Sequence, residues 1–177
     1  MGERLWVIGY GVWLAMLLTA CGHQAPQRPS QHKSGEHTVT QADSTTIRLM
    51  EMNVQLMEAA EEQLLHYAQA QDEPYALYER GTWVHVIEQG GTQAVQPNEE
   101  CTVRMQVYSL SGTFYMDHEQ TARIGKGQLP AAVEENITEW HHGARLRLIA
   151  PWFAAYGIQG TTTVPPYENV IIDLEIR

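Results

Sequence analysis

The hydrophobic pattern of this chain changes its period once, close to Pro74, and that change limits the fold more than any other feature. Before Pro74, apolar residues recur at spacings of three and four, which is typical of a helix with one apolar face. After residue 80, apolar and polar residues alternate, which is typical of strands with one buried face. Because proline cannot continue a helix, the sequence predicts one long helix followed by a sheet.

We expect the helix at residues 43–73, with Asp43 or Ser44 as its cap. We favour packing of its apolar stripe against its own domain, with the methionines filling the core. The methionines would also suit a client-binding face, and part of the stripe fits a heptad, so helix 44–72 is alternatively a dimer contact. The stripe comprises Ile47, Leu49, Met50, Met52, Val54, Leu56, Met57, Leu64, Leu65 and Ala68.

Five alternating stretches and one short helical segment follow the long helix. The stretches lie at residues 82–87, 101–108, 113–116, 146–150 and 170–176, and the helical segment at residues 131–142. An antiparallel sheet that covers one helix would bury one face of every stretch. The predicted fold class is therefore α+β.

The N-terminus has the features of an export signal. An apolar run at residues 5–18 is shorter than the about 20 residues of a membrane span. It ends in Leu-Thr-Ala-Cys at positions 18–21, and small residues before a cleavage point are typical of signal peptides. This ending resembles the bacterial lipobox, in which the thiol of Cys21 would carry a diacylglycerol group. We therefore expect residues 1–20 to be a lipoprotein signal peptide; an uncleaved anchor helix or an ordinary signal peptide is the alternative.

Residues 21–42 are rich in Gln, His, Pro, Ser and Thr and lack an apolar period, which predicts a flexible tether. Its three histidines are more simply solvated than metal-bound: His23, His32 and His37. Gram-negative lipoproteins with aspartate after the lipidated cysteine stay in the inner membrane, and here Gly22 follows. By that resemblance, the expected location is the cell envelope, with the lipid on Cys21 anchoring the protein to the outer membrane, facing the periplasm.

The charge and the cysteines exclude several kinds of partner. The formal net charge is −10, and Lys33 and Lys126 are the only lysines. Nucleic acid binding needs clustered cations, so nucleic acid is not an expected partner. Zinc sites need more closely spaced ligands than Cys21 and Cys101 provide, and we expect neither a metal nor a cofactor. A disulfide between these two cysteines is possible only if Cys21 is not lipidated.

The last third of the chain carries motifs in a characteristic order. Ala155-Tyr156-Gly157 follows a proline, Val164-Pro165-Pro166 comes next, and the closing stretch at 170–176 alternates apolar residues with Asp and Glu. These motifs resemble the FKBP family of peptidyl-prolyl cis-trans isomerases. The resemblance implies an FKBP-type domain at residues 74–177, a curved antiparallel sheet wrapped on one short helix, here preceded by the long N-terminal helix. With the lipobox and the Arg-Gly-Thr-Trp segment at 80–83, the chain is similar to gliding-motility-associated FKBP lipoproteins of the Bacteroidetes.

The family builds its site from aromatic side chains, a tyrosine hydroxyl, an aspartate and a backbone N–H. The resemblance places Tyr156 at the tyrosine, Asp117 at the aspartate and Tyr115 at one wall aromatic, as catalytic candidates. It also implies a set of substrate-binding residues: Met105, Leu129, Pro130, Val133, Val164 and Ile172. Ordinary core packing of the two tyrosines is the alternative.

Several of these residues depart from the family pattern. Counting back from Gly143 puts Val133 where the family has a tryptophan at the pocket floor. The same count puts Pro130, which has no N–H, at the backbone donor, and Met105 replaces another aromatic. We expect weakened activity for this reason. Three aromatics could refill the space: Trp140, Trp152 and Phe153.

Prolyl isomerisation needs no nucleophile, metal or cofactor, because the enzyme only lowers a rotation barrier of about 18–20 kcal/mol. An apolar pocket and a few hydrogen bonds to the twisted imide are sufficient. The expected function is isomerisation of X-Pro bonds in envelope proteins, with proline-containing polypeptides as clients. One alternative is an FKBP-fold binding or chaperone subunit of an envelope machine without significant catalysis. Another is a structural lipoprotein that dimerises through residues 44–72.

Overall fold

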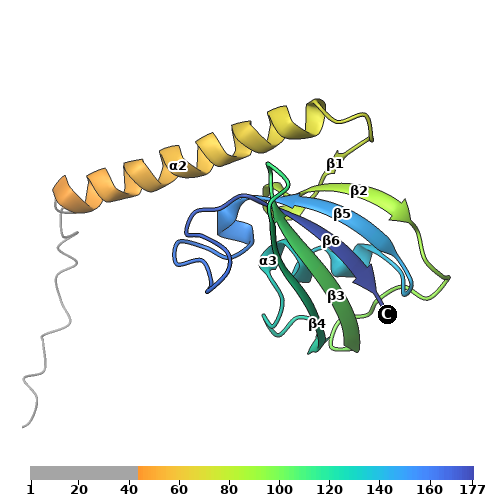
Figure 1. Ribbon diagram of the computed structural model, residues 1–177. Coiled ribbons are helices and arrows are strands. Elements are labelled where there is room, and N and C mark those ends of the chain that lie inside the picture. Colours follow the sequence, from red (N-terminus) through yellow and green to blue (C-terminus); the bar gives the residue numbers. More distant parts are fainter. Residues whose placement is uncertain (1–43) are drawn as a thin grey trace, which may run out of the picture. The chain divides into compact units, whose positions relative to one another are not determined.

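The computed structural model describes residues 44–177 (Figure 1). The predicted signal peptide, the lipidation site Cys21 and the tether at 21–42 lie outside these residues, so they stay predictions. Among the described residues, no helix combines the length and the hydropathy of a membrane span, and no three ligating side chains form a metal cluster.

The described part begins with α2 (Ser44–Gln69), a helix of 26 residues that confirms the helix predicted before Pro74. It is followed by a six-stranded antiparallel sheet in the order β1-β2-β5-β6-β3-β4. The strands are β1 (Ala76–Leu77), β2 (Trp83–Glu88), β3 (Glu100–Ser109), β4 (Phe114–Arg123), β5 (Arg145–Ala150) and β6 (Val170–Ile176). The curved sheet with one short helix, α3 (Ala131–Glu134), confirms the predicted α+β, FKBP-like fold (Figure 1).

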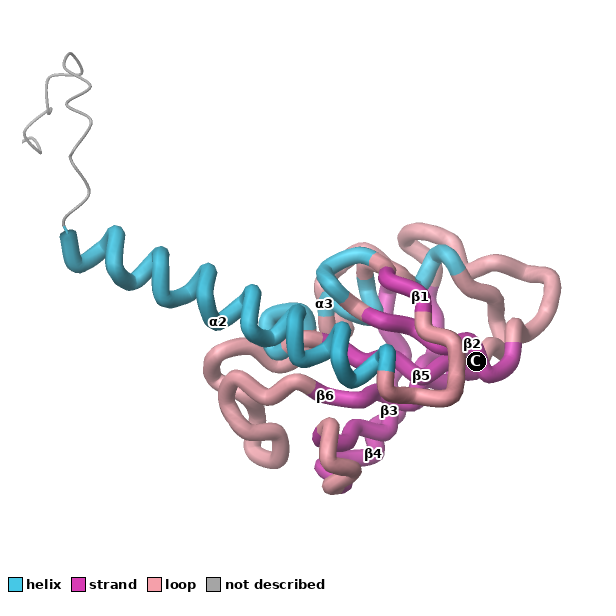
Figure 2. The backbone as a smooth tube through the Cα atoms, turned by 90° about the horizontal axis from the view of Figure 1, so that it is seen from above, coloured by secondary structure: helices cyan, strands magenta, loops and turns pink. Residues whose placement is uncertain are grey.

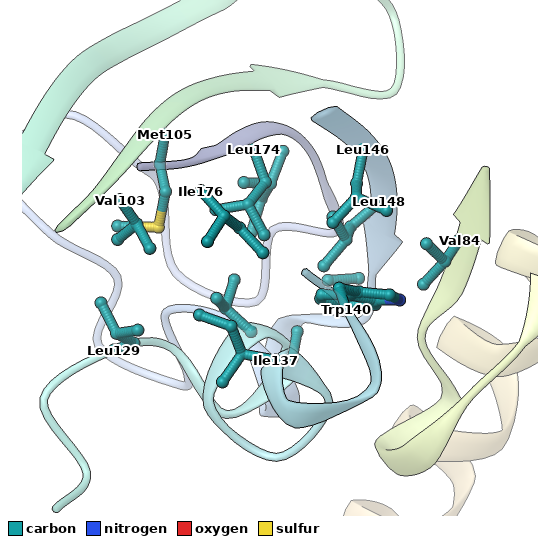
Figure 3. Close-up of a cluster of buried hydrophobic side chains, with 14 of the residues drawn as sticks. Val84, Val103, Met105, Leu129, Ile137, Trp140, Leu146, Leu148, Leu174 and Ile176 are labelled. Carbon is teal, nitrogen blue, oxygen red and sulfur yellow. The ribbon is translucent and has the colours of Figure 1, made fainter. Parts of the chain in front are cut away.

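The inner face of the sheet forms the core. On β3, every second residue is buried, including Val103 and Met105. In Figure 3, side chains of β5 and β6 such as Leu148 and Ile176 project toward Ile137 and Trp140, which follow α3. The two-residue period of the sequence thus corresponds to one buried face, as expected for a half-covered sheet.

The outer face of the sheet carries ion pairs in place of apolar side chains. Arg147 binds both carboxylate oxygens of Asp173 on the neighbouring strand, at 2.6 and 2.8 Å. Arg177 similarly reaches Glu119 at 2.6 Å. These bonds satisfy the polar face, so a second layer over most of it is unnecessary.

Only the last part of α2 packs on this outer face. Leu64 and Ala68 form a second apolar cluster with Ile149 of β5, and Gln63 accepts a hydrogen bond from the buried Asn169 at 2.7 Å. The first half of the helix extends beyond the sheet (Figures 1 and 2). The expected packing against the helix's own domain therefore holds only for the C-terminal part.

The expectation that the methionines of α2 fill the core is wrong. Met50 and Met52 are 60% and 58% exposed, and Met57 is 38% exposed. The sheet lies beneath only the last turns of α2, so the earlier apolar residues have no surface of their own domain to cover. They are Ile47, Leu49, Met50, Met52, Val54, Leu56 and Met57.

The short helix is also shorter than the predicted segment 131–142. It ends at Glu134 and continues only as a 3₁₀ turn, η2 (Ile137–Glu139). The buried amide of Asn136 donates to the Ala132 carbonyl at 2.9 Å and accepts the Glu79 N–H at 3.1 Å. Asparagine side chains that bond the backbone compete with helix continuation, and here they also fix α3 to the segment before β2.

Candidate functional site

Tyr156 follows β5 and the 3₁₀ turn η3 (Trp152–Ala154). Its ring is half-buried, whereas its hydroxyl is fully buried and has no hydrogen-bond partner within residues 44–177. An unpaired hydroxyl in an apolar interior costs about 1–3 kcal/mol, and an acceptor supplied by a ligand would relieve that cost. Burial raises the pKa of Tyr156 to about 12, so the hydroxyl is a protonated donor at neutral pH.

Tyr156 packs against the main buried cluster, which contains five of the six predicted substrate-binding residues. They are Met105, Leu129, Val133, Val164 and Ile172, and all five are buried. Val133, Val164 and Ile172 have no exposed surface at all. The apolar environment expected around the tyrosine is therefore present, and its floor is covered by other side chains.

Half-buried side chains from two segments that are distant in sequence pack against this cluster. Tyr115 and Met116 from β4, and Phe153 and Tyr156 from after β5, are half-buried against the cluster. Because Val133, Val164 and Ile172 have no exposed surface, a proline ring could contact them only after the side chains above them move. Met116 was not predicted as a site residue.

The loop between η3 and β6 is attached to β4 at this place. The Tyr115 hydroxyl donates to Glu168 Oε1 at 2.9 Å, and Thr163 Oγ1 lies 3.8 Å from Met116 Sδ. Burial, together with Glu168, raises the pKa of Tyr115. These contacts hold the loop that carries Pro165 and Pro166 beside the covered cluster.

Asp117 lies on the outer face of the sheet, so the expectation that it shares a hollow with Tyr156 does not hold. It stands opposite Gln106, and Arg104 donates to its two carboxylate oxygens at 2.9 and 2.6 Å. Hydrogen bonds from Arg104 and Gln106 lower the pKa of Asp117 to about 2. Met116 is paired with the buried Val107 and therefore faces the core, and the pairing shifts by one residue beyond it, so that the extra residue, Tyr115, also packs against the core.

Pro130 stands directly before α3, half-buried, and its carbonyl accepts the N–H groups of Val133 and Glu134 at 2.9 Å. The turn before it is held by the carboxylate of Glu134. Oε1 accepts the N–H groups of residues 125–127 at 2.6–3.1 Å, and Oε2 accepts that of Leu129 at 3.0 Å. Glu134 therefore positions Leu129 and Pro130. A Gly-Lys-Gly turn followed by an acidic residue in the first turn of a helix is the pattern that could have indicated this role.

Of the three aromatics proposed to refill the site, Phe153 alone is among the half-buried side chains over the cluster. Trp140 lies near Leu148 and Val84, on the side of the core away from Met105 and Leu129 (Figure 3). Trp152 packs edge-on against Tyr167, with ring centroids 4.9 Å apart. Neither tryptophan therefore replaces the one that the family places at the floor.

The raised pKa of Tyr156 predicts a specific alkaline effect. Between about pH 10 and about pH 12 the unfolded chain loses this proton while the folded chain keeps it, so stability falls as pH rises through this range. We expect Tyr156→Phe to be more stable than the wild type by about 1 kcal/mol at neutral pH, and the gap to widen above about pH 10. Urea unfolding at about pH 7, pH 9 and pH 11 measures this. An equal loss in both proteins above about pH 10 would contradict the burial of this hydroxyl.

Comparisons with known proteins agree with this architecture. Residues 91–177 match the sequence profile of a family described as FKBP-type peptidyl-prolyl cis-trans isomerase. A search of curated proteins gave no match. A peptidyl-prolyl cis-trans isomerase of Pseudomonas syringae pv. tomato is structurally similar, with a TM-score of 0.57, 19% identity, and coverage of 68% of this chain and 92% of that one. FkpA from Escherichia coli also has a TM-score of 0.57, with 20% identity over 75% of this chain and 63% of its own. At these identities, the structural likeness shows the fold.

Proposed function

Because residues 91–177 belong to the FKBP-type peptidyl-prolyl cis-trans isomerase family, the chain is a prolyl isomerase, and we propose that it acts with low efficiency on X-Pro bonds of envelope proteins. In this proposal Tyr156 contacts the substrate, and folding polypeptides that contain proline are the clients. The observation that carries the proposal is the buried, unpaired hydroxyl of Tyr156 beside an apolar cluster, and the sequence resemblance assigns this residue to the family's tyrosine.

The chemistry needs only an environment that favours the twisted imide. Moving the imide from water into an apolar cluster disfavours its planar, charge-separated form. The Tyr156 hydroxyl would donate a hydrogen bond to the carbonyl of the residue before proline, and this bond contributes to catalysis if it strengthens as the bond twists. Because the pKa of Tyr156 is about 12, the donor is present throughout the neutral range.

Three features support a low efficiency. The floor residue Val133 has no exposed surface, so the substrate must first displace covering side chains. Pro130 has no N–H to offer, and the expected carboxylate of Asp117 lies on the other face of the sheet.

We expect Tyr156→Phe to lower kcat/KM for a proline-containing test peptide about fivefold to tenfold, the effect of one hydrogen bond in a dry site. The measurement is a protease-coupled isomerisation assay on the full chain. Asp117→Asn is the matched control and should leave the rate unchanged, since Asp117 bonds only Arg104 and Gln106 among the hydrogen bonds described. A rate that falls with Asp117→Asn and not with Tyr156→Phe would refute this site.

Restoring a backbone donor should increase the activity. We expect Pro130→Ala to raise kcat/KM about fivefold, because alanine supplies the N–H that proline lacks. Pro97→Ala, a change in an exposed turn, is the control for the general effect of losing a proline. No increase with Pro130→Ala, in a protein that unfolds at the same urea concentration as the wild type, would remove Pro130 from the site.

A second candidate function is client binding without catalysis, and the exposed first half of α2 favours it. Large apolar surfaces on a folded protein mark contacts with other proteins, and three exposed methionines adapt well to varied partners. This surface would hold either an unfolded client or a second copy of the chain. Removing residues 44–58 should abolish suppression of client aggregation while the isomerase rate is kept. A halved mass in solution after the same deletion would identify the dimer instead.

The envelope location rests on the lipobox and is a separate proposal. A lipid anchor at Cys21 would hold the domain at the outer membrane, facing the periplasm. In the native cell, Cys21→Ala should move the protein from the membrane fraction to the soluble fraction. Retention of this variant in the membrane fraction would show that another segment attaches it.

A further inference from the structure

A groove of about 490 Å³ lies between α2 and the β1–β2 edge of the sheet. Its apolar lining is formed by Leu65, Leu77 and Trp83, and its acidic lining by Glu58, Glu61 and Glu62. The groove belongs neither to the covered cluster around Tyr156 nor to the apolar first half of α2.

The fold itself creates this apolar lining. Leu77 and Trp83 are paired across β1 and β2, so their side chains share the outer face of the sheet. Leu64 docks α2 on Ile149, which leaves the next residue, Leu65, at the side of the helix above the sheet edge. Leu77 remains 60% exposed and Leu65 36% exposed, so both are available to a ligand.

The carboxylates sit close over this lining. A Cβ at Gly81 would lie 3.5 Å from Glu61 Oε1, so Glu61 reaches across from the helix to the segment before β2. Glu62 lies 3.7 Å from His66, which is itself exposed on the same helix. Neither lysine nor arginine lines the groove, so the three carboxylates meet no fixed cation there.

The surface next to the groove extends the same charge. A second hollow of about 580 Å³ shares Leu77 and Gly81 with the first. It adds Glu79, Glu135 and Glu139 and a single cation, Arg80, which is already paired with Glu135 at 2.7 Å. Field lines from carboxylates on one surface add together, so the whole edge attracts positive charge.

We propose that this groove binds a polypeptide segment that carries apolar side chains between lysines or arginines. The apolar side chains would leave water against Leu77 and Trp83, while the cations meet the glutamates. A second copy of this chain does not fit, because its net charge is −10. An anionic membrane surface is repelled for the same reason. The groove lies on the outer face at the β1 edge of the sheet, whereas Tyr156 packs against the cluster on the inner face, so the groove is a separate site and does not depend on the proposed role of Tyr156.

The test uses a capped, fluorescein-labelled peptide, Lys-Leu-Lys-Leu-Lys, which contains no proline and therefore bypasses the isomerase site. Fluorescence anisotropy with the full chain should show saturable binding that weakens with added salt. The triple variant Glu58→Gln, Glu61→Gln, Glu62→Gln should raise Kd about tenfold or more, and Leu77→Ser about fivefold. Isomerase activity should stay unchanged in both variants.

Two controls separate the groove from general attraction to an acidic protein. The first control is a second triple variant, Glu88→Gln, Glu100→Gln, Glu119→Gln, which changes the net charge by the same amount away from the groove. It should raise Kd less than about twofold, which is the effect of distant, screened charges. The peptide Lys-Ser-Lys-Ser-Lys should bind at least about fivefold more weakly, because it has no apolar side chains. Equal losses in the two triple variants, equal binding of the two peptides, or the absence of binding would each overturn the proposal.

Discussion

Replacing Glu134 by alanine is expected to lower the free energy of unfolding by about 2–3 kcal/mol, because one carboxylate accepts four backbone N–H groups. Without this carboxylate, the backbone N–H groups of residues 125–127 would form hydrogen bonds with water instead, and the turn would lose its fixed conformation. Leu129 and Pro130 follow this turn directly, so kcat/KM should fall together with stability. Urea unfolding followed by tryptophan fluorescence measures the first effect, and the protease-coupled assay measures the second.

Glu135→Ala is the matched control, since it removes the same side chain one residue later. Glu135 is paired with Arg80 at an exposed position, and such pairs contribute less than about 1 kcal/mol. If the two substitutions destabilise the protein equally, the four hydrogen bonds do not hold the turn.

Leu148→Ala is expected to have the largest effect on folding, a loss of about 2–5 kcal/mol. Leu148 has no exposed surface, and it lies between Val84 and Ile172 on the two neighbouring strands. Removing three carbon atoms there leaves a cavity that strands held on both sides cannot close. The free energy of unfolding from urea titration checks this expectation.

For comparison, Leu77→Ala removes the same atoms from a side chain that is 60% exposed, and it should cost no more than about 0.5 kcal/mol. A similar loss for the two leucines would mean that the inner face of β5 is not the core.

Much of the fold could be predicted because its elements have strong local patterns. The spacing of apolar residues and Pro74 defined α2, and strict alternation defined β2, β3, β5 and β6 within a few residues. The motif around Tyr156 predicted the family, because its glycines and prolines have fixed positions relative to the closing strand. The two-residue strand β1 has too few residues to produce any such pattern.

The errors concern properties that depend on distant parts of the chain. The sequence of a helix shows which of its faces is apolar, but it does not show which surface covers that face. The exposure of Met50 and Met52 could therefore not be predicted. That Tyr115 and Met116 both pack inward depends on one extra residue in the pairing of β3 and β4, and a slip of one residue exchanges the two faces of a strand. Asp117 was misplaced for that reason. The early end of α3 depends on Asn136 meeting Glu79, 57 residues away.

The position of the acidic groove relative to Tyr156 has a consequence for substrate choice. The groove lies on the outer face at the β1 edge, and Tyr156 packs against the inner-face cluster, so a polypeptide that reaches both must pass around the sheet. A polypeptide held by its basic segment in the groove would present nearby prolines to Tyr156 at a high effective concentration. The protein would then select substrates by the sequence that surrounds their prolines. For such a tethered substrate, KM should be lower than for a short peptide, while kcat should be the same.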